Sequence, residues 1–190
     1  RIPIEGYVWL DKFERTTPSG WRIRKSLQSS VSRIRRSYAK SPMGKVSDDM
    51  SQRLKVLFLC TGNSCRSQMA EGWTRHLMSE HIDAYSAGIE THGLNPNAVS
   101  VMAELGVDIS SQKSQNISEF QDMDLDFVIT VCGHAHETCP IFPYKATVLH
   151  HGFDDPPKMA KEYSDIQSQL ACYRKVRDQI RDFVLMLPQY

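Results

Sequence analysis

Apolar residues in this chain of 190 amino acids fall into short continuous runs that are separated by stretches of helical spacing. Residues 54–59 form the first run, which only Lys55 interrupts, and such a run predicts a strand buried on both faces. Similar or shorter runs predict further strands at residues 82–87, 126–131 and 146–150. Together these runs indicate one central sheet.

Helical spacing of apolar residues fills the segments between the predicted strands. A first helix is expected to begin at Arg66, and a second at Asn95 and Pro96, which are residue types typical of helix starts. Residues 117–121 predict a single helical turn, and a terminal amphipathic helix is expected over residues 166–187. The apolar stripe of that terminal helix consists of Ile166, Leu170, Tyr173, Val176, Ile180, Val184 and Leu187.

Strands that alternate with helices predict a mostly parallel sheet with helices on both faces. We therefore expect an α/β fold, with three α/β/α layers around a four-stranded parallel sheet. In the loop at residues 107–115, Val107 and Ile109 are expected to be buried. Open sheets of this type bind ligands at the carboxyl ends of their strands, so the candidate functional residues are those that directly follow a strand.

The distribution of charge divides the chain near Met50. Residues 1–53 carry 12 Lys or Arg and 5 Asp or Glu, a net charge of +7, whereas residues 54–190 carry a net charge of −6. We expect residues 1–50 to be a basic extension and residues 51–190 to be the folded domain. The extension is rich in serine and arginine and is expected to be disordered or partly helical.

Three roles remain open for residues 1–49: an arm for nucleic acid or an anionic surface, a targeting segment, or upstream sequence that precedes a start at Met50. No apolar run reaches the length of a bilayer crossing and no signal-peptide pattern is visible, so we expect a cytoplasmic protein. Five cysteines are an odd number for a disulfide scaffold. They are more typical of catalytic, redox-active or buried thiols.

The main chemical pattern joins the first strand to the first helix and reads Cys60-Thr61-Gly62-Asn63-Ser64-Cys65-Arg66-Ser67. The backbone N–H groups of such a loop and the helix N-terminus favour a bound anion and a thiolate at Cys60. Arg66 can donate two parallel hydrogen bonds to a tetrahedral oxyanion, and Ser67 can donate a hydrogen bond to the thiolate. Asn63 tolerates a positive φ. The alternative is a buried cysteine in a glycine-containing turn. The strand before it and the helix after it favour a phosphate-type loop.

A second group of candidate residues follows the third strand and contains Cys132, His134, His136 and Cys139. It allows three interpretations: a zinc site, two ordinary buried thiols, or a redox pair. The possible zinc ligands are crowded together and no second half-site follows, so we favour the redox pair. A thiol near Cys60 could attack an adduct on that residue, and Cys139 could then attack Cys132.

Two aspartates follow the last strand in Gly152-Phe153-Asp154-Asp155-Pro156-Pro157. A carboxyl group near the loop could protonate a leaving oxygen. A turn or helix-capping aspartate is the common alternative. We prefer Asp155 as the general acid because it directly precedes the prolines that stiffen this segment, and Asp154 is the second choice.

These motifs resemble the thioredoxin-coupled arsenate reductases, which share the fold of low-molecular-weight protein tyrosine phosphatases. The resemblance covers about residues 54–187 and leaves residues 1–49 outside. It rests on residues 60–67 with the following Gln68-Met69-Ala70-Glu71-Gly72, on Tyr85-Ser86-Ala87-Gly88-Ile89-Glu90-Thr91-His92-Gly93, on the Cys132/Cys139 spacing and on residues 152–156.

The resemblance implies a role for each candidate residue. Cys60 is the nucleophile on arsenate, Arg66 clamps the oxyanion, and Asp155 is the general acid. Cys132 then resolves the arseno-thiol intermediate. Cys139 completes the surface disulfide that thioredoxin reduces.

Some relatives also bind potassium beside the loop, through side chains that match Asn63, Glu71 and Ser86 and through a fourth, acidic residue. Gln115 stands at that fourth position, which departs from the pattern and leaves the potassium site open. The resemblance implies no tightly bound cofactor besides this ion. His151 stands where relatives often have tryptophan.

The function implied by the resemblance is reduction of arsenate to arsenite by a disulfide relay that thioredoxin recycles. No flavin, nicotinamide or metal motif is visible, so the electrons are expected to come from thiols. We expect a monomer whose partners are arsenate and thioredoxin, without membrane or nucleic-acid binding.

Two other functions compete with arsenate reduction. A phosphomonoesterase of the low-molecular-weight phosphatase type needs Cys60, Arg66 and an acid but no redox pair, and weak phosphatase activity is expected as a by-product. A regulator that senses anions or binds nucleic acid is the other alternative, and the intact Cys60/Arg66 pair argues against it.

Overall fold

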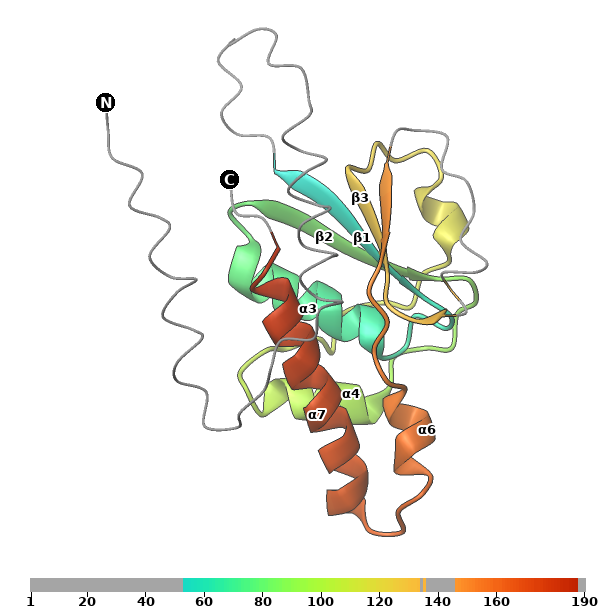
Figure 1. Ribbon diagram of the computed structural model, residues 1–190, viewed down its shortest axis with the longest axis vertical. Coiled ribbons are helices and arrows are strands. Elements are labelled where there is room, and N and C mark those ends of the chain that lie inside the picture. The colour runs from blue at the N-terminus through green and yellow to red at the C-terminus, as the bar shows by residue number, and fades with distance from the viewer. Residues whose placement is uncertain (1–52, 134, 136–145, 188–190) are drawn as a thin grey trace, which may run out of the picture.

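The computed structural model describes residues 53–133, 135 and 146–187. Its strands are β1 (Leu54–Cys60), β2 (Ile82–Gly88), β3 (Phe127–Thr130) and β4 (Thr147–His150). They form one four-stranded parallel sheet in the order β2-β1-β3-β4 (Figure 1). The predicted α/β class and the parallel sheet are thereby confirmed.

The described helices cover both faces of the sheet. They are α3 (Arg66–Met78), α4 (Pro96–Ala103), the 3₁₀-helix η2 (Ile117–Phe120), α6 (Pro156–Ala160) and α7 (Ile166–Val184). Figure 1 shows α3, α4 and α7 on one side of the sheet, with η2 across the sheet from them. Successive side chains of a strand point to opposite faces, and almost every residue of β1 is buried, so both faces of the sheet are covered.

The strand order brings the ends of β1 and β3 together. β1 lies between β2 and β3, and its register pairs Cys60 with Gly88 and Leu59 with Thr130. The chain leaves β1 toward β2 in one direction and leaves β3 toward β4 in the other. In open α/β sheets, ligands bind where this direction reverses. Cys60 ends β1 and Cys132 follows β3 at that point.

The strand bounds differ from the predicted ones by one residue at one or both ends, and the larger differences lie at α6 and α7. Ile166, at the start of α7, is 54% exposed, so its assignment to the buried stripe is wrong, and α7 ends at Val184 rather than at residue 187. The sequence pattern treats residues 152–157 as a loop, but a short helix, α6, begins there. Asp155 is its N-cap and Pro156 is its first residue, where the missing N–H of proline leaves no hydrogen bond unmade.

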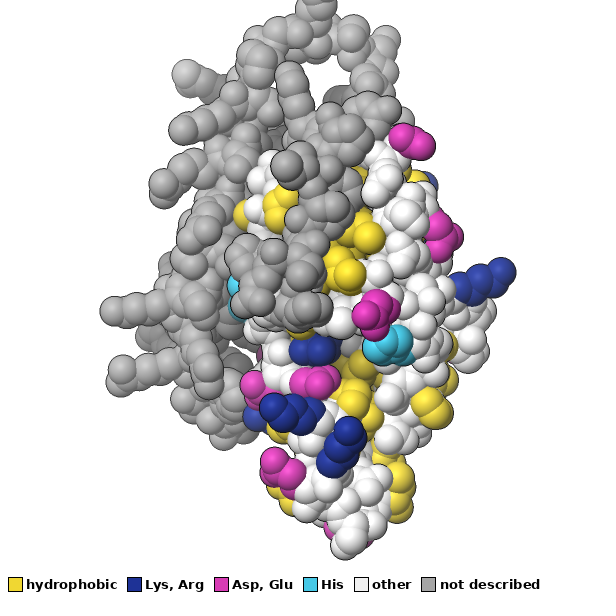
Figure 2. All heavy atoms as spheres, turned by 90° about the vertical axis from the view of Figure 1, so that its right-hand side faces the viewer, with side chains coloured by type: hydrophobic (Ala, Val, Ile, Leu, Met, Phe, Trp, Pro, Cys, Tyr) yellow, Lys and Arg dark blue, Asp and Glu magenta, His cyan; other side chains and the backbone are white. Residues whose placement is uncertain are grey.

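Several predictions concern residues that the structure does not describe. These are the basic extension at residues 1–50 and the segment that contains Cys139 and the two neighbouring histidines. Within the described residues, Val107 and Ile109 are buried as predicted. No helix among them is both long and apolar enough to cross a bilayer. In the coloured part of Figure 2, acidic and basic side chains are interspersed and form no patch of one sign.

A buried arginine fastens α7 to α4. Arg177 Nη1 donates to the carbonyl oxygen of Val101 at 2.8 Å and to the carboxylate of Glu104 at 3.0 Å. Arg174, one turn earlier, binds the same carboxylate at 2.7 Å. Hydrogen bonds from Arg174, and then from Arg177, hold the pKa of Glu104 below its usual value. The C-terminal end of α4 is therefore tied to α7 by charged groups as well as by apolar packing.

We predict that Arg177→Met lowers the free energy of unfolding by about 2 kcal/mol, because the buried carbonyl of Val101 loses its donor and Glu104 loses one partner. Urea denaturation measures the change. Arg181 on the same helix is a matched control, since it is partly exposed and pairs with Asp182. Arg181→Met should change stability by less than about 0.5 kcal/mol. Equal losses in the two variants would contradict the assigned role of Arg177.

Candidate active site

The loop at residues 61–65 carries the chain from the end of β1 to the start of α3. Cys60 is the last residue of β1 and is 3% exposed. The backbone N–H of Asn63 donates to its Sγ at 3.2 Å, and the hydroxyl of Ser67 lies 2.9 Å from the same sulfur. Asn63 has φ = 42°, in the left-handed region that few residues other than glycine adopt. The loop and the first turn of α3 therefore each bring one polar group to the Cys60 sulfur.

The side chain of Asn63 uses all of its hydrogen-bonding positions. Its Nδ2 donates to Ser67 Oγ and to Ser86 Oγ, each at 2.9 Å. Its Oδ1 accepts from the backbone N–H of Gln115 at 2.7 Å and from Gln68 Nε2 at 3.0 Å. Because Asn63 is completely buried, these four contacts replace water and hold the residue in its unusual backbone conformation.

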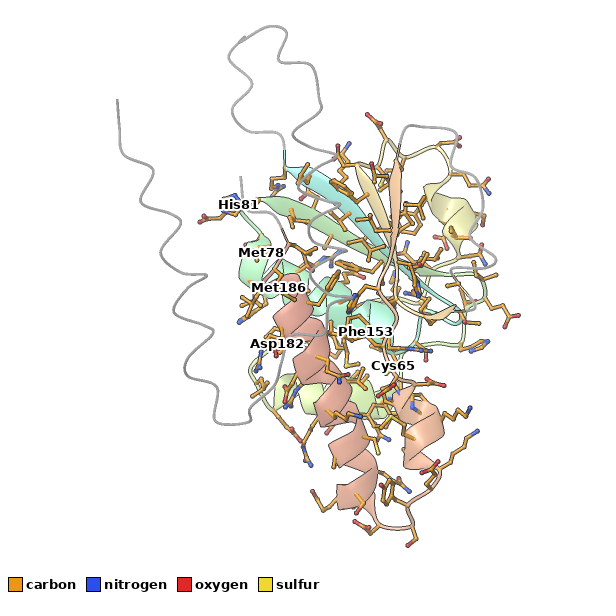
Figure 3. All side chains as sticks on the ribbon, viewed as in Figure 1. Cys65, Met78, His81, Phe153, Asp182 and Met186 are labelled. Atoms are coloured by element: carbon orange, nitrogen blue, oxygen red, sulfur yellow. The ribbon has the colours of Figure 1, made fainter. Side chains whose placement is uncertain are left out.

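Arg66 connects the start of α3 to the loop that follows β4. Its Nη1 donates to the carbonyl oxygen of Phe153 at 3.2 Å, and its Nη2 lies 3.2 Å from Asp155 Oδ1. Asp154 points elsewhere and pairs with Lys175 at 3.1 Å. Figure 3 shows Phe153 between the end of the sheet and α7. The structure thus brings Asp155, the preferred aspartate, to Arg66 and leaves Asp154 outside this group.

Cys132 lies beside the same loop. It is 5% exposed, and its Sγ is 3.3 Å from the hydroxyl oxygen of Thr61, the residue after Cys60. Cys139 and the two histidines of the possible zinc set lie outside the described residues. Among the residues that are described, no three His, Cys, Asp or Glu side chains are grouped so as to hold a metal ion.

Residues 89–95 hold the remaining part of the loop. The backbone N–H groups of His92 and Asn95 donate to the carbonyl oxygens of Gly62 and Ser64, each at 2.9 Å. Cys65 is buried in the hydrophobic core (labelled in Figure 3), and this burial raises the pKa of its thiol far above the usual value. A thiol that stays protonated is a poor nucleophile, so burial disfavours Cys65 as the reacting thiol of the loop.

The residues that match the potassium ligands of relatives lie close together. Ser86 Oγ donates to Glu71 at 2.5 Å, and Asn63 presents its amide nitrogen to the same hydroxyl. Glu71 is also paired with Arg75 at 2.7 Å, and burial raises its pKa. The side chain of Gln115 forms its hydrogen bond elsewhere. Hard cations take oxygen ligands, so an amide donor and a carboxylate that already pairs with arginine do not fit a potassium ion.

Sequence reasoning missed the residues that support the loop from a distance. Asn95 was identified only as a helix start, yet its Nδ2 also donates to Tyr173 of α7 at 3.3 Å. Gln68 is completely buried, and Gln112 donates to its side-chain oxygen at 2.6 Å. The spacing of apolar residues along the predicted first helix gave no signal for Gln68, because its burial comes from segments distant in the sequence. A buried amide of this kind requires partners.

An aromatic cluster supports the segment that carries Asp155. The ring of His151 stacks on Phe183 of α7, with centroids 4.5 Å apart and planes at 6°, and the ring of Phe153 packs edge-on against both. Burial, and to a lesser extent the neighbouring His150, lower the pKa of His151 from 6.5 to about 4. A neutral histidine therefore occupies the position where relatives often have tryptophan.

Comparisons with known proteins agree on one family. Residues 55–187 match the family of the low molecular weight phosphotyrosine protein phosphatase. An arsenate reductase of Halalkalibacterium halodurans is 50% identical over 125 residues, which is 66% of this chain and 88% of that protein. An arsenate reductase of Bacillus subtilis is 48% identical, with the same coverage.

Solved structures show the same similarity in three dimensions. An arsenate reductase in a phosphate-binding state aligns with a TM-score of 0.52 at 33% identity, covering 70% of this chain and 94% of that one. A low molecular weight protein tyrosine phosphatase from T. tengcongensis aligns with a TM-score of 0.56 at 25% identity, covering 70% of this chain and 96% of that one.

The lowered pKa of His151 predicts a pH-dependent stability. Between pH 6.5 and about pH 4 the unfolded chain binds a proton at this residue and the folded chain does not, so acid favours unfolding. We expect a loss of about 2 kcal/mol from pH 7 to pH 4, less than the full shift implies because the ring is partly exposed. Urea denaturation at several pH values measures it. His151→Phe should flatten this part of the profile, and an unchanged slope in that variant would contradict the prediction.

The backbone of the loop after Cys60 lies so close to Gly88 that it leaves no room for a side chain at this position. A Cβ at this position would lie 2.7 Å from the backbone nitrogen of Asn63 and 2.8 Å from the carbonyl oxygen of Thr61. We expect Gly88→Ala to lower the free energy of unfolding by about 1–3 kcal/mol and to weaken the protection of Cys60 by bound phosphate against iodoacetamide. In Gly62→Ala the added Cβ meets the exposed ring of His92, which can turn aside, so the loss should be smaller. A larger loss of stability in Gly62→Ala than in Gly88→Ala would show that the backbone contacts of Gly88 do not constrain the loop.

Proposed function

The chain belongs to the low molecular weight phosphotyrosine protein phosphatase family, and from that premise we propose that it reduces arsenate to arsenite with Cys60 as the nucleophile. The names of its relatives from Halalkalibacterium halodurans and Bacillus subtilis support this choice of substrate. The observation that carries the proposal is the second buried thiol, Cys132, beside the loop that begins at Cys60. Hydrolysis of a phosphate ester has no use for that thiol.

The first step uses the loop as an oxyanion cradle. Arsenate is tetrahedral and anionic, so it suits the N-terminus of α3 and the guanidinium of Arg66. When the oxyanion takes up the Arg66 donors, the Asp155 carboxylate is released from its contact with Arg66, takes up a proton and passes it to the leaving oxygen. The Cys60 thiolate attacks arsenic, a sulfur–arsenic bond forms, and the protonated oxygen leaves as water.

The second step transfers two electrons. The thiolate of Cys132 attacks the Cys60 sulfur, and the sulfur–arsenic bond breaks with its electron pair remaining on arsenic. Arsenic(V) thereby becomes arsenic(III), arsenite leaves, and a disulfide joins Cys60 to Cys132. Cys139 then attacks Cys132 and frees Cys60, and the dithiol of thioredoxin reduces the resulting Cys132–Cys139 disulfide.

A phosphomonoesterase activity is the second candidate. A phosphoenzyme mechanism needs a thiol nucleophile, an arginine and an acid, and the loop offers Cys60 and Arg66, with Asp155 in contact with Arg66. We therefore expect slow hydrolysis of p-nitrophenyl phosphate as a side reaction of the same loop.

The decisive experiment is arsenate-dependent oxidation of NADPH by the full chain with thioredoxin and thioredoxin reductase. A parallel assay with glutathione and glutaredoxin identifies the thiol donor. Steady NADPH oxidation with thioredoxin is expected. Rapid hydrolysis of phosphate esters, without arsenite in either assay, would replace the proposal with the phosphatase function.

Serine variants of the two further cysteines separate the steps. Cys139→Ser should release one arsenite per protein and then stop as a Cys60–Cys132 disulfide, because no third thiol can free Cys60. Cys132→Ser should stop before arsenite is released. Both variants should still hydrolyse p-nitrophenyl phosphate, and mass spectrometry of the oxidised proteins identifies the disulfides. Repeated turnover of arsenate by both variants at the wild-type rate would refute the relay.

A further inference from the structure

We propose that Gln112 is a positioning residue for Cys60, at the far end of a chain of hydrogen bonds whose donors all point toward the Cys60 sulfur. The chain runs from Gln112 through Gln68, Asn63 and Ser67 to Cys60. The proposal rests on the proposed function only in taking Cys60 as the nucleophile. It assigns a role to a residue that lies 52 positions away from Cys60 in the sequence.

The orientation of the Asn63 amide determines which groups donate in the hydrogen bonds near the Cys60 sulfur. The backbone N–H of Gln115 can only donate, so the atom it faces at 2.7 Å must be the amide oxygen. The amide nitrogen of Asn63 is then the atom that faces Ser67 Oγ at 2.9 Å, and it donates to that oxygen. The Ser67 hydroxyl keeps its own hydrogen for the Cys60 sulfur, 2.9 Å away.

The donors and acceptors of the hydrogen bonds farther from the sulfur are assigned in the same way. Gln68 Nε2 lies 2.9 Å from the carbonyl oxygen of Lys113, 3.0 Å from Asn63 Oδ1 and 3.1 Å from the carbonyl oxygen of Asn63, and all three oxygens can only accept. Gln112 Nε2 faces the carbonyl oxygen of Gln68 at 3.1 Å and donates to the side-chain oxygen of Gln68 at 2.6 Å. Backbone groups thus orient each of the three amides, and their donors follow one direction.

The burial of Gln68 makes its hydrogen bond with Gln112 energetically important. Gln68 is completely buried, and Gln112 supplies the contact to its side-chain oxygen. Without Gln112, that oxygen loses its donor in a site where water is scarce. Hydrogen bonds in such a chain polarise one another, so a change at one end reaches the thiolate at the other.

The test is the pH profile of Cys60 alkylation by iodoacetamide in the full chain, followed by mass spectrometry of the Cys60 peptide. Gln112→Met keeps the volume of the side chain but removes its donor. We expect its profile to move toward higher pH by about 0.5 unit, which is about a threefold loss of thiolate below the midpoint. Gln121→Met, an exposed position at the end of η2, is the control and should leave the profile in place.

A double-mutant cycle tests the route. Ser67→Ala removes the last hydrogen bond of the series, the one to Cys60. Adding Gln112→Met to Ser67→Ala should therefore cause no further change in the alkylation profile. A shift that persists in the Ser67→Ala background would overturn the proposal. So would a lower free energy of unfolding in Gln112→Met with an unchanged profile, because that result describes a purely structural residue.

Alkylation needs neither arsenate nor a reductant, so this test is independent of the proposed function. An unchanged alkylation profile in Gln112→Met, in a protein that reduces arsenate, would remove the role of Gln112 and leave the function standing. A wild-type chain that fails to reduce arsenate, while Gln112→Met shifts the profile, would remove the function and leave the role of Gln112 standing.

Discussion

Asn63 has to hold a left-handed backbone conformation, and much of the site depends on how the structure meets that requirement. The conformation turns a backbone N–H toward the Cys60 sulfur, and four hydrogen bonds to the buried side chain keep it there. Two of the four partners, Ser67 and Gln68, belong to α3, Ser86 belongs to β2, and Gln115 lies in the loop after α4. The cradle is therefore a product of three segments of the fold, although its residues are contiguous in the sequence.

The order of the strands decides which chemistry can be added to that cradle. A phosphate-type loop needs a strand, a turn and a helix N-terminus, and these lie within residues 54–78. Placing β3 directly beside β1 adds Cys132 at the same edge of the sheet, next to Thr61. A second buried thiol at this position is what supports a reductase over a hydrolase in the proposed function, since the two reactions share Cys60, Arg66 and Asp155.

The terminal helix α7 supports the site without supplying a reacting group. Its Tyr173 accepts a hydrogen bond from Asn95, whose backbone holds the loop at Ser64. Its Phe183 stacks on His151, just before the segment that carries Asp155. Both ends of the site are thus braced by the same helix, and the buried Arg177 ties that helix to α4.

The sequence by itself determined the local features of this protein. The strand at residues 54–59, the loop after Cys60 and the helix from Arg66 follow from apolar periodicity and turn residues, because those signals act over a few neighbouring positions. The different partners of Asp154 and Asp155 depend on the tertiary structure, which brings Arg66 to one carboxylate and Lys175 to the other. The link from Gln112 to Gln68 likewise spans 44 positions. Such contacts are decided by strand order and helix packing, which place distant residues together, and no spacing along the chain encodes them.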